Sequence, residues 1–230
     1  MIRNLKALGI AFVAVFAMSA IAASGAQATN AHLKCTTEEP SCVVELTEHP
    51  NPVLGVQVFE TVLGVVECSE FDAVYEGAST ATGNSTLEEV EYNNCEAFGI
   101  EAEVDFGTCD YTLAAPFETV AGHGQGDVTI GPAGCVVTII VGSTAEPLCE
   151  IFVEGAQPFE DAITYTNVET NGKEEITGHA NANGIEYSWE GLICGEGEDN
   201  TGTYEGTFTA KAFKTPSAGG AQVNLTTVDT

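Results

Sequence analysis

A glycine-rich acidic loop carries the residues best suited to binding a metal ion. Between Gly195 and Gly202, the residues Glu198, Asp199 and Asn200 place carboxylate and amide oxygens side by side. Calcium prefers oxygen ligands of this kind. The spacing departs from the Asp-x-Asp-x-Asp-Gly pattern of an EF-hand loop. We therefore favour an ordinary solvated turn here and expect no cofactor, with a calcium site at Glu198, Asp199 and Asn200 as the alternative.

The other polar residues show no catalytic spacing. The histidines His32, His49, His123 and His179 are scattered, and no Gly-x-Ser-x-Gly elbow occurs. A hydrolytic site can still be built from a serine, a histidine and a carboxylate, or from two carboxylates, that lie far apart in sequence. We predict no catalytic residue and favour a chain that is not an enzyme.

The cysteines indicate disulfides rather than a metal or redox site. A zinc or redox site needs close pairs such as Cys-x-x-Cys, and no such pair occurs. An even number of cysteines in an exported chain is typical of a disulfide framework. The eight cysteines are Cys35, Cys42, Cys68, Cys95, Cys109, Cys135, Cys149 and Cys194.

The start of the chain has the layout of a secretory signal peptide. Arg3 and Lys6 precede an apolar run from Ala7 to Ala23, and the small residues Ala26 and Ala28 fit a cleavage site. This predicts a signal peptide over residues 1–28 and a single secreted domain over residues 29–230. An uncleaved N-terminal anchor is the alternative, because the run is longer than a typical signal core. We expect no membrane contact after cleavage.

The chain is strongly acidic, with 34 Asp and Glu residues, 6 Lys and Arg residues and a formal net charge of −28. Loss of Arg3 and Lys6 with the signal peptide would take the charge to −30 and leave four lysines. Nucleic-acid affinity depends on Lys and Arg displacing counterions from phosphates, so nucleic acid is excluded as a partner. The hydrophobic content of 44% argues for a packed core rather than disorder.

Alternating apolar and polar residues predict β-strands along the whole secreted part. From Ile100 to Phe106, apolar residues occupy one parity and carboxylates the other. The stretch from Val136 to Val141 is apolar on both faces, which predicts a central strand. Many short strands separated by turn residues predict an all-β fold, an antiparallel two-sheet sandwich or jelly-roll-like domain stapled by disulfides.

Two turn signals and four aromatic residues refine this prediction. Asn171-Gly172 and Asn183-Gly184 are typical of type I′ hairpins and predict a meander of strands over residues 163–168, 174–181 and 185–190. Four nearby aromatic side chains would offer a platform for stacking sugars if they faced water, but their strand parity favours the core. These are Tyr187, Trp189, Tyr204 and Phe208.

The strand order narrows the disulfide pairing. Cys95 and Cys109 flank one strand and would lie roughly 20 Å apart, whereas bridged cysteines need Cα atoms within about 7 Å. The same objection applies to Cys135 and Cys149, because a hairpin puts Cys149 beside the far end of its partner strand. If the strands alternate up and down, our pairing hypothesis is Cys35 with Cys42, Cys68 with Cys95, Cys109 with Cys135, and Cys149 with Cys194.

Three segments carry a resemblance to a known group. The leader from Met1 to Ala11, with Tyr92-Asn93-Asn94-Cys95 and Gly107-Thr108-Cys109-Asp110-Tyr111, resembles uncharacterised secreted cysteine-containing β-proteins of actinobacterial type. The similarity covers the leader and the middle cysteines. It implies export and a cysteine-linked β fold, and it implies no activity and no site residues.

These features favour a non-enzymatic binding or structural module, exported to the cell envelope or the extracellular space. Regular strand faces and disulfides explain durability better than turnover. The expected partner is an extracellular protein or glycan. The alternative is a secreted hydrolase of glycans or peptides whose site is assembled from distant residues, and a third hypothesis is an adhesion module stabilised by calcium at Glu198, Asp199 and Asn200.

Overall fold

The computed structural model describes residues 31–36, 41–78, 85–113, 117–120, 123–214 and 220–229, so the predicted signal peptide lies outside it. The described chain consists of strands and contains no helix that could span a membrane. The strands are β1 (Ala31–Thr36), β2 (Ser41–Glu48), β3 (Gln57–Thr61), β4 (Gly64–Ala78), β5 (Ser85–Ala97), β6 (Ile100–Asp105), β7 (Asp110–Leu113), β8 (Phe117–Val120), β9 (His123–Gly131), β10 (Val136–Ser143), β11 (Glu146–Glu154), β12 (Gln157–Thr170), β13 (Lys173–Gly191), β14 (Gly195–Phe213) and β15 (Gln222–Asp229).

The strands form one 15-stranded sheet in which every described pairing is antiparallel. This confirms the antiparallel all-β class. The sandwich or jelly-roll form is not confirmed, because the hydrogen-bonded path is continuous instead of being divided into two sheets. Four long strands account for the continuity: β4, β5, β13 and β14 have 15, 13, 19 and 19 residues and each pairs with different neighbours at its two ends.

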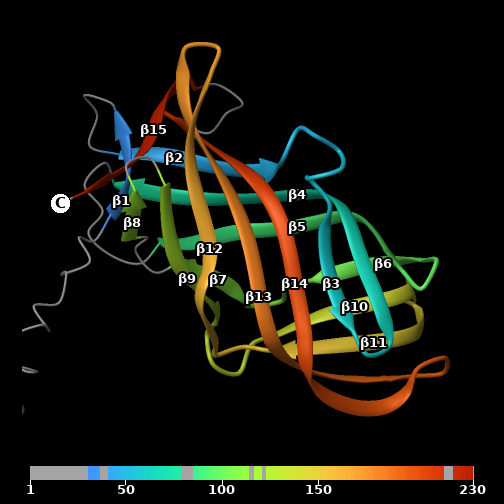
Figure 1. Ribbon diagram of the computed structural model, residues 1–230. Coiled ribbons are helices and arrows are strands. Elements are labelled where there is room, and N and C mark those ends of the chain that lie inside the picture. The colour runs from blue at the N-terminus through green and yellow to red at the C-terminus, as the bar shows by residue number, and fades with distance from the viewer. Residues whose placement is uncertain are drawn as a thin grey trace, which may run out of the picture.

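The sheet closes on itself in two rings that share these long strands. One ring runs through β14, β2, β4, β5, β7, β9, β12 and β13. The other runs through β14, β3, β4, β5, β6, β10, β11 and β13. Figure 1 shows β12, β13 and β14 crossing in front of β4, β5, β10 and β11. The inner faces of both rings therefore enclose one interior.

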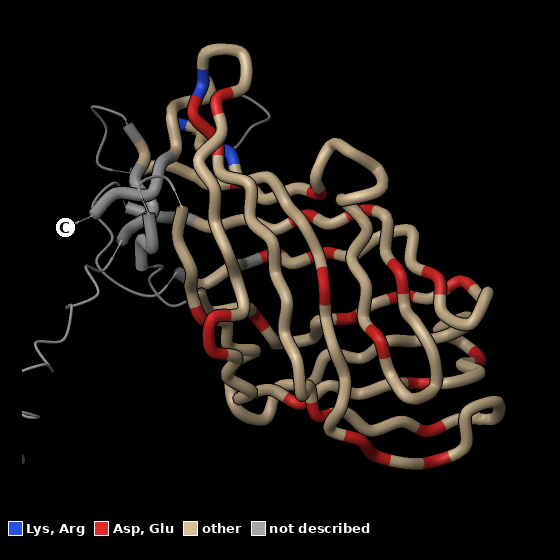
Figure 2. The backbone as a smooth tube through the Cα atoms, viewed as in Figure 1, with Lys and Arg blue, Asp and Glu red and all other residues tan. Residues whose placement is uncertain are grey.

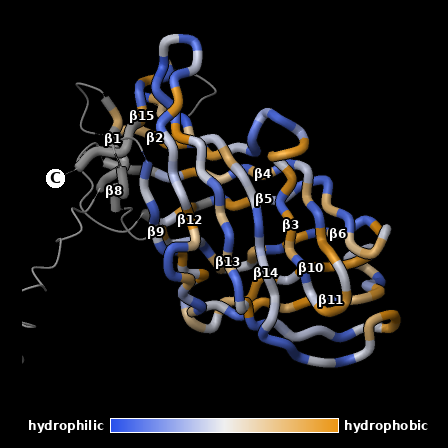
Figure 3. The backbone as a smooth tube through the Cα atoms, viewed as in Figure 1, coloured by the Kyte–Doolittle hydropathy of each residue, from blue (hydrophilic) through white to orange (hydrophobic). Residues whose placement is uncertain are grey.

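The strand faces follow the alternation expected from the sequence. In β6, Ala102 is buried while Glu101 and Glu103 are exposed, which confirms the predicted strand. Acidic residues are spread along most strands (Figure 2), and hydropathy alternates along them (Figure 3). β10 lies between β6 and β11 as a central strand, but only Val137, Ile139 and Val141 are buried. The predicted central strand is therefore confirmed, and its second apolar face stays partly exposed because only one face of a closed sheet looks inward.

One of the two predicted hairpins is present. Asn171 and Gly172, with φ of 54° and 75°, join β12 to β13 in the predicted turn. The prediction at Asn183-Gly184 is wrong, because both residues lie inside the continuous strand β13, where the register against β14 shifts after Asn183. The positive φ of Gly184 thus serves a β-bulge, which bends the strand without reversing it.

Four disulfides staple the fold, and the hypothesis on their pairing is confirmed. They join Cys35 to Cys42, Cys68 to Cys95, Cys109 to Cys135, and Cys149 to Cys194. Cys68 and Cys95 stand directly opposite each other in the β4–β5 ladder. Disulfides persist in oxidising compartments, so these bonds indicate that the protein matures outside a reducing cytosol.

The core contains two apolar clusters. The Phe106 cluster gathers buried side chains that include Phe59, Val66, Phe106, Ile139 and Ile185. The Phe208 cluster includes Val44, Phe71, Tyr165, Ile176 and Phe208. Val90, Tyr92, Tyr111 and Val128 pack against both clusters, so the interior is continuous from one to the other.

Candidate functional site

An apolar cavity of about 120 Å³ lies between the two clusters. Residues of both clusters line it, among them Phe59, Phe106 and Ile139 from one and Phe71, Ile163 and Phe208 from the other. The exceptions in an otherwise apolar lining are the amide of Gln57 and the hydroxyl groups of three tyrosines. A protein interior is normally close-packed, so a cavity of this size is a feature that calls for an explanation.

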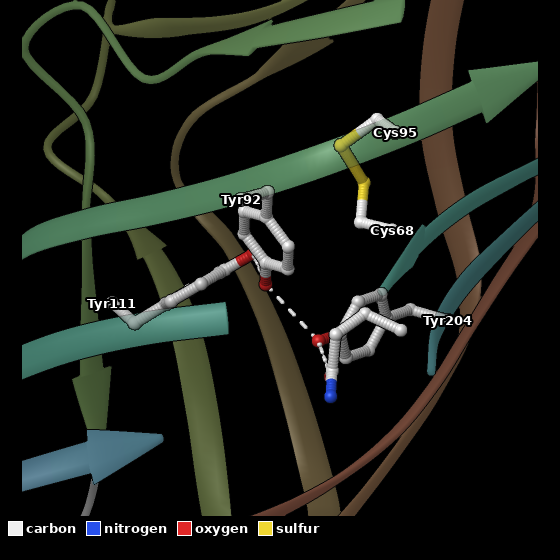
Figure 4. The surroundings of a disulfide bond; sticks show 6 residues. Cys68, Tyr92, Cys95, Tyr111 and Tyr204 are labelled. Atoms are coloured by element: carbon white, nitrogen blue, oxygen red, sulfur yellow. Dashed lines mark hydrogen bonds between the residues drawn. A yellow bond between two sulfur atoms is a disulfide. The ribbon is translucent and has the colours of Figure 1, made fainter. Parts of the chain in front are cut away.

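The three tyrosines meet in the cavity through their hydroxyl groups. Tyr92 Oη lies 3.1 Å from Tyr111 Oη and 3.0 Å from Tyr204 Oη. Figure 4 shows Tyr92, Tyr111 and Tyr204 pointing toward one another from separate strands, beside the Cys68–Cys95 disulfide. The strands concerned are β5, β7 and β14, so the closure of the sheet brings together residues that are far apart in sequence.

Gln57, at the start of β3, continues the tyrosine network. Its Oε1 accepts a hydrogen bond of 2.6 Å from Tyr204 Oη. Its Nε2 donates to the backbone oxygens of Gly55 and Thr207, at 2.9 and 3.2 Å. A Cβ atom at Gly206 would lie 1.8 Å from Gln57 Oε1, so the absence of a side chain at Gly206 makes room for the amide. Every polar atom of the Gln57 side chain is hydrogen-bonded.

Aromatic packing holds the tyrosine rings in place. The Tyr92 ring stacks on Phe106 with centroids 5.6 Å apart, and the Tyr111 ring meets Phe106 edge to face at 5.3 Å. The ring centroids of Tyr92 and Phe71 also lie close, 5.1 Å apart. Offset-stacked and edge-to-face arrangements are the favourable geometries for aromatic pairs. The packing of the rings therefore holds the hydroxyl groups in position.

The tyrosine hydroxyls are neutral at physiological pH. Burial raises the pKa of Tyr111 to about 12. Burial also raises the pKa of Tyr92 and Tyr204, and Coulombic repulsion from the neighbouring tyrosines adds to the shift. A phenol with a raised pKa stays protonated at neutral pH, and a protonated phenol is a poor base and a poor nucleophile. The cavity thus offers neutral hydrogen-bonding groups rather than a catalytic base.

The predicted calcium residues lie elsewhere, at an outer hollow of about 470 Å³. Asp199 Oδ1 accepts hydrogen bonds from the Thr201 hydroxyl and backbone N–H, which lower the pKa of Asp199. Among the described residues, no three His, Cys, Asp or Glu side chains form a group that could hold a metal ion. The hollow is lined by Glu154, Glu186, Tyr187, Ser188, Glu198, Asp199 and Asn200. The calcium site stays a prediction, without added support.

One constellation on the outer face bears on the hydrolase alternative. His179 Nδ1 lies 3.1 Å from Thr207 Oγ1, and His179 Nε2 lies 3.8 Å from Glu205 Oε1. The order hydroxyl, imidazole and carboxylate is that of a catalytic triad. However, the side chains of His179 and Glu205 are 41% and 68% exposed, and none of the three residues lines the interior cavity. The hydrolase alternative stays a prediction.

The outer surface repels negative charge. On neighbouring strands, Asp72 lies near Glu48, Glu91, Glu70 and Glu45, and its pKa is raised by partial burial and by these carboxylates. Lys173 begins β13 after the β12–β13 turn, Lys211 lies near the end of β14, and Lys214 directly follows β14 (Figure 2). A surface of this charge disfavours anionic ligands.

Sequence reasoning identified part of this site and missed the rest. The parity argument is confirmed for Tyr187 and Phe208, which are buried. It also places Tyr204 correctly on the inner face, where it lines the cavity. Gln57 was missed, although it shares a strand parity with the apolar Phe59, and a polar residue at an inward position is a signal for a buried network. The cavity itself leaves no signal in the sequence.

Three comparisons with known proteins gave no match, whether to a protein-family model, to a curated protein or to a solved structure. The cavity and its polar groups are therefore the basis on which a function is inferred.

Proposed function

We propose that this chain is an exported, non-enzymatic binding module that holds a small apolar ligand in its interior cavity. The observation that carries the proposal is the cavity of about 120 Å³ lined by side chains from strands of both rings. An engineered apolar cavity of roughly 150 Å³ stays dry and binds benzene or xenon. A compound with a single ring is therefore the size of ligand that this interior suits.

The chemistry of the lining supports the same proposal. Apolar side chains from both clusters surround the space, and transfer of an apolar ring out of water into such a lining is favourable. The few polar groups are neutral, so a charged ligand would lose its hydration without gaining an ion pair. The acidic exterior acts against anions as well.

Export is the second component of the proposal. The signal peptide expected over residues 1–28 and the four disulfides support it together. The site of action would be the cell envelope or the extracellular space, where a small apolar compound is scarce in water and needs a carrier or a receptor. N-terminal sequencing of secreted protein tests this component, and Thr29 is the expected first residue.

Calorimetric titration with toluene tests the binding component. We expect the oxidised protein to bind toluene with a 1:1 stoichiometry. Ala182 lines the cavity and is 9% exposed, so Ala182→Leu should fill the space and abolish the heat of binding. Ala145 lies exposed in the turn between β10 and β11 and provides the matched control, since Ala145→Leu should leave binding unchanged. Absence of binding to the unmodified protein would refute the proposal.

A further inference from the structure

The hydrogen bonds of Gln57 have only one consistent direction. The backbone oxygens of Gly55 and Thr207 are acceptors, so the amide nitrogen of Gln57 must face them. This leaves Gln57 Oε1 facing Tyr204, at 2.6 Å. An amide oxygen cannot donate, so Tyr204 must be the donor in this bond.

The assignment of donor and acceptor at Gln57 determines the roles of each tyrosine in turn, because each hydroxyl has a single proton to donate. Tyr204 uses its proton on Gln57, so Tyr92 must donate across the 3.0 Å contact to Tyr204. Tyr92 has then no proton left, and Tyr111 must donate across the 3.1 Å contact to Tyr92. The chain therefore runs from Tyr111 through Tyr92 and Tyr204 to Gln57.

Tyr111 is the open end of this chain. Tyr92 and Tyr204 each donate one bond and accept one, whereas Tyr111 donates one and accepts none from any described residue. Tyr111 lines the apolar cavity, and its hydroxyl oxygen keeps a lone pair with which it can accept a hydrogen bond. A ligand with an O–H or N–H group would satisfy it, and a ligand with only an acceptor would not.

We infer that the cavity selects neutral single-ring compounds that carry one hydrogen-bond donor, such as phenols, and that the Tyr111 hydroxyl oxygen accepts this hydrogen bond. This inference rests on the proposed function and specifies its ligand class. Gln57 acts as a positioning residue. It sets the direction of the hydrogen-bond chain, and it does not itself accept the hydrogen bond of the ligand. Gly206, which leaves room for the Gln57 amide, supports this arrangement from β14.

Titration of the disulfide-intact protein with three probes of similar size tests the inference. Phenol carries a donor, anisole carries only an acceptor, and toluene carries neither. We expect phenol to bind about tenfold more tightly than anisole, the difference that one satisfied buried hydrogen bond produces. Toluene should bind without reaching the affinity of phenol.

Two conservative variants identify the residues responsible. Tyr111→Phe removes the oxygen that accepts the hydrogen bond of the ligand, so phenol should lose about tenfold in affinity while toluene changes by less than about twofold. Gln57→Met removes the acceptor that fixes the direction of the hydrogen-bond chain. Tyr111 can then donate to a ligand as well as accept from it, so the preference for phenol over anisole should disappear. Tyr165 lies outside the cavity lining, and Tyr165→Phe should leave the preference intact as a control.

The outcomes separate this inference from the proposed function. Toluene binding without a preference for phenol over anisole would overturn the inference alone. A preference that survives both Tyr111→Phe and Gln57→Met would also overturn it, because the donor would then be recognised elsewhere. Failure of all three probes to bind would overturn the proposed function, and the inference with it.

Discussion

Two neighbouring parts of the interior differ in the hydrogen bonding of their buried tyrosine hydroxyls and in the space around them. In the central cavity, three tyrosine hydroxyls and Gln57 form a hydrogen-bonded chain beside about 120 Å³ of space. In the adjoining packed end, Tyr165 is 2% exposed, its hydroxyl has no hydrogen-bond partner among the described residues, and the void is only about 10 Å³. The residues Leu46, Leu87, Leu113 and Phe208 line both spaces and separate them.

The difference between the two void volumes shows that loose packing of the interior as a whole does not account for the cavity. The same sheet closes tightly around Ile176 and Ala210, which are 0% and 3% exposed in the packed end. A few residues away, the sheet surrounds a larger space, which is lined by the hydrogen-bonded tyrosines and Gln57. Tight packing and a cavity thus occur side by side in one interior, in different parts of the same sheet.

Alkaline pH should produce the largest effect, and it acts on both regions. Burial raises the pKa of Tyr92, Tyr111, Tyr165 and Tyr204, so the native state keeps these protons after the unfolded chain has lost them. Stability is therefore unaffected by these groups below the unfolded pKa of about 10 and falls as the pH rises above it. At pH 11 the loss should be about 1.4 kcal/mol for each tyrosine, or roughly 5.5 kcal/mol for the four together.

Denaturant unfolding at pH 8, 10 and 11, with absorbance at 295 nm to follow phenolate, checks this prediction. Tyr165→Phe should remove about a quarter of the alkaline loss, since it removes one of the four groups. Ionisation of all six tyrosines in the native state near pH 10 would contradict the burial of both regions.

Enlarging one alanine in each region sharpens the comparison further. Ala210→Leu adds three carbons to the packed end and should destabilise the protein by about 1–3 kcal/mol, since overpacking forces strain. Ala182→Leu places the same atoms in the cavity and should be neutral or stabilising. Urea unfolding of both variants measures the difference. Equal destabilisation by the two substitutions would mean that the cavity side is also fully packed.

Removal of single hydroxyl groups should have a smaller effect, of opposite sign in the two regions. Tyr204→Phe leaves Gln57 Oε1 buried without its donor and should cost about 1–2 kcal/mol. Tyr165→Phe removes a hydroxyl that has no partner and should be neutral or slightly stabilising. Thermal unfolding at neutral pH compares the two variants. A larger loss from Tyr165→Phe than from Tyr204→Phe would reverse the comparison.

The smallest effect is expected on the outer face, where carboxylates repel each other. The pKa of Asp72 is raised, so its charge opposes folding at neutral pH, and this cost is relieved as the pH falls through the raised pKa. Asp72→Asn should stabilise by a few tenths of a kcal/mol at low ionic strength, after screening by water and salt. The gain should vanish in about 1 M salt. A gain that persists at high salt would indicate a cause other than repulsion.

The sequence was sufficient to predict local features and insufficient for the closure of the sheet. The strand from Ile100 onward and the turn at Asn171-Gly172 depend on residue parity and on local backbone angles, which the sequence shows directly. The disulfide pairing followed from strand direction. The turn prediction at Asn183-Gly184 was wrong because a glycine with a positive φ occurs in β-bulges as well as in turns. Only the pairing of the strand with β14 distinguishes the two.

The candidate site was beyond the reach of the sequence for a related reason. Tyr92, Tyr111 and Tyr204 come from three strands, and Gln57 lies 147 residues from Tyr204 along the chain. Their meeting depends on which strands become neighbours when the rings close. The parity of each residue could be predicted, but the space left between the side chains depends on the packing of both clusters together.

Xenon binding in a crystal would report the apolar cavity itself, because xenon fills apolar space without needing a hydrogen bond. We expect a xenon atom in the cavity between Phe106 and Phe208, and we expect its loss in Ala182→Leu but not in Ala145→Leu. Crystals under xenon that show these side chains in contact with each other and no xenon between them would contradict this expectation.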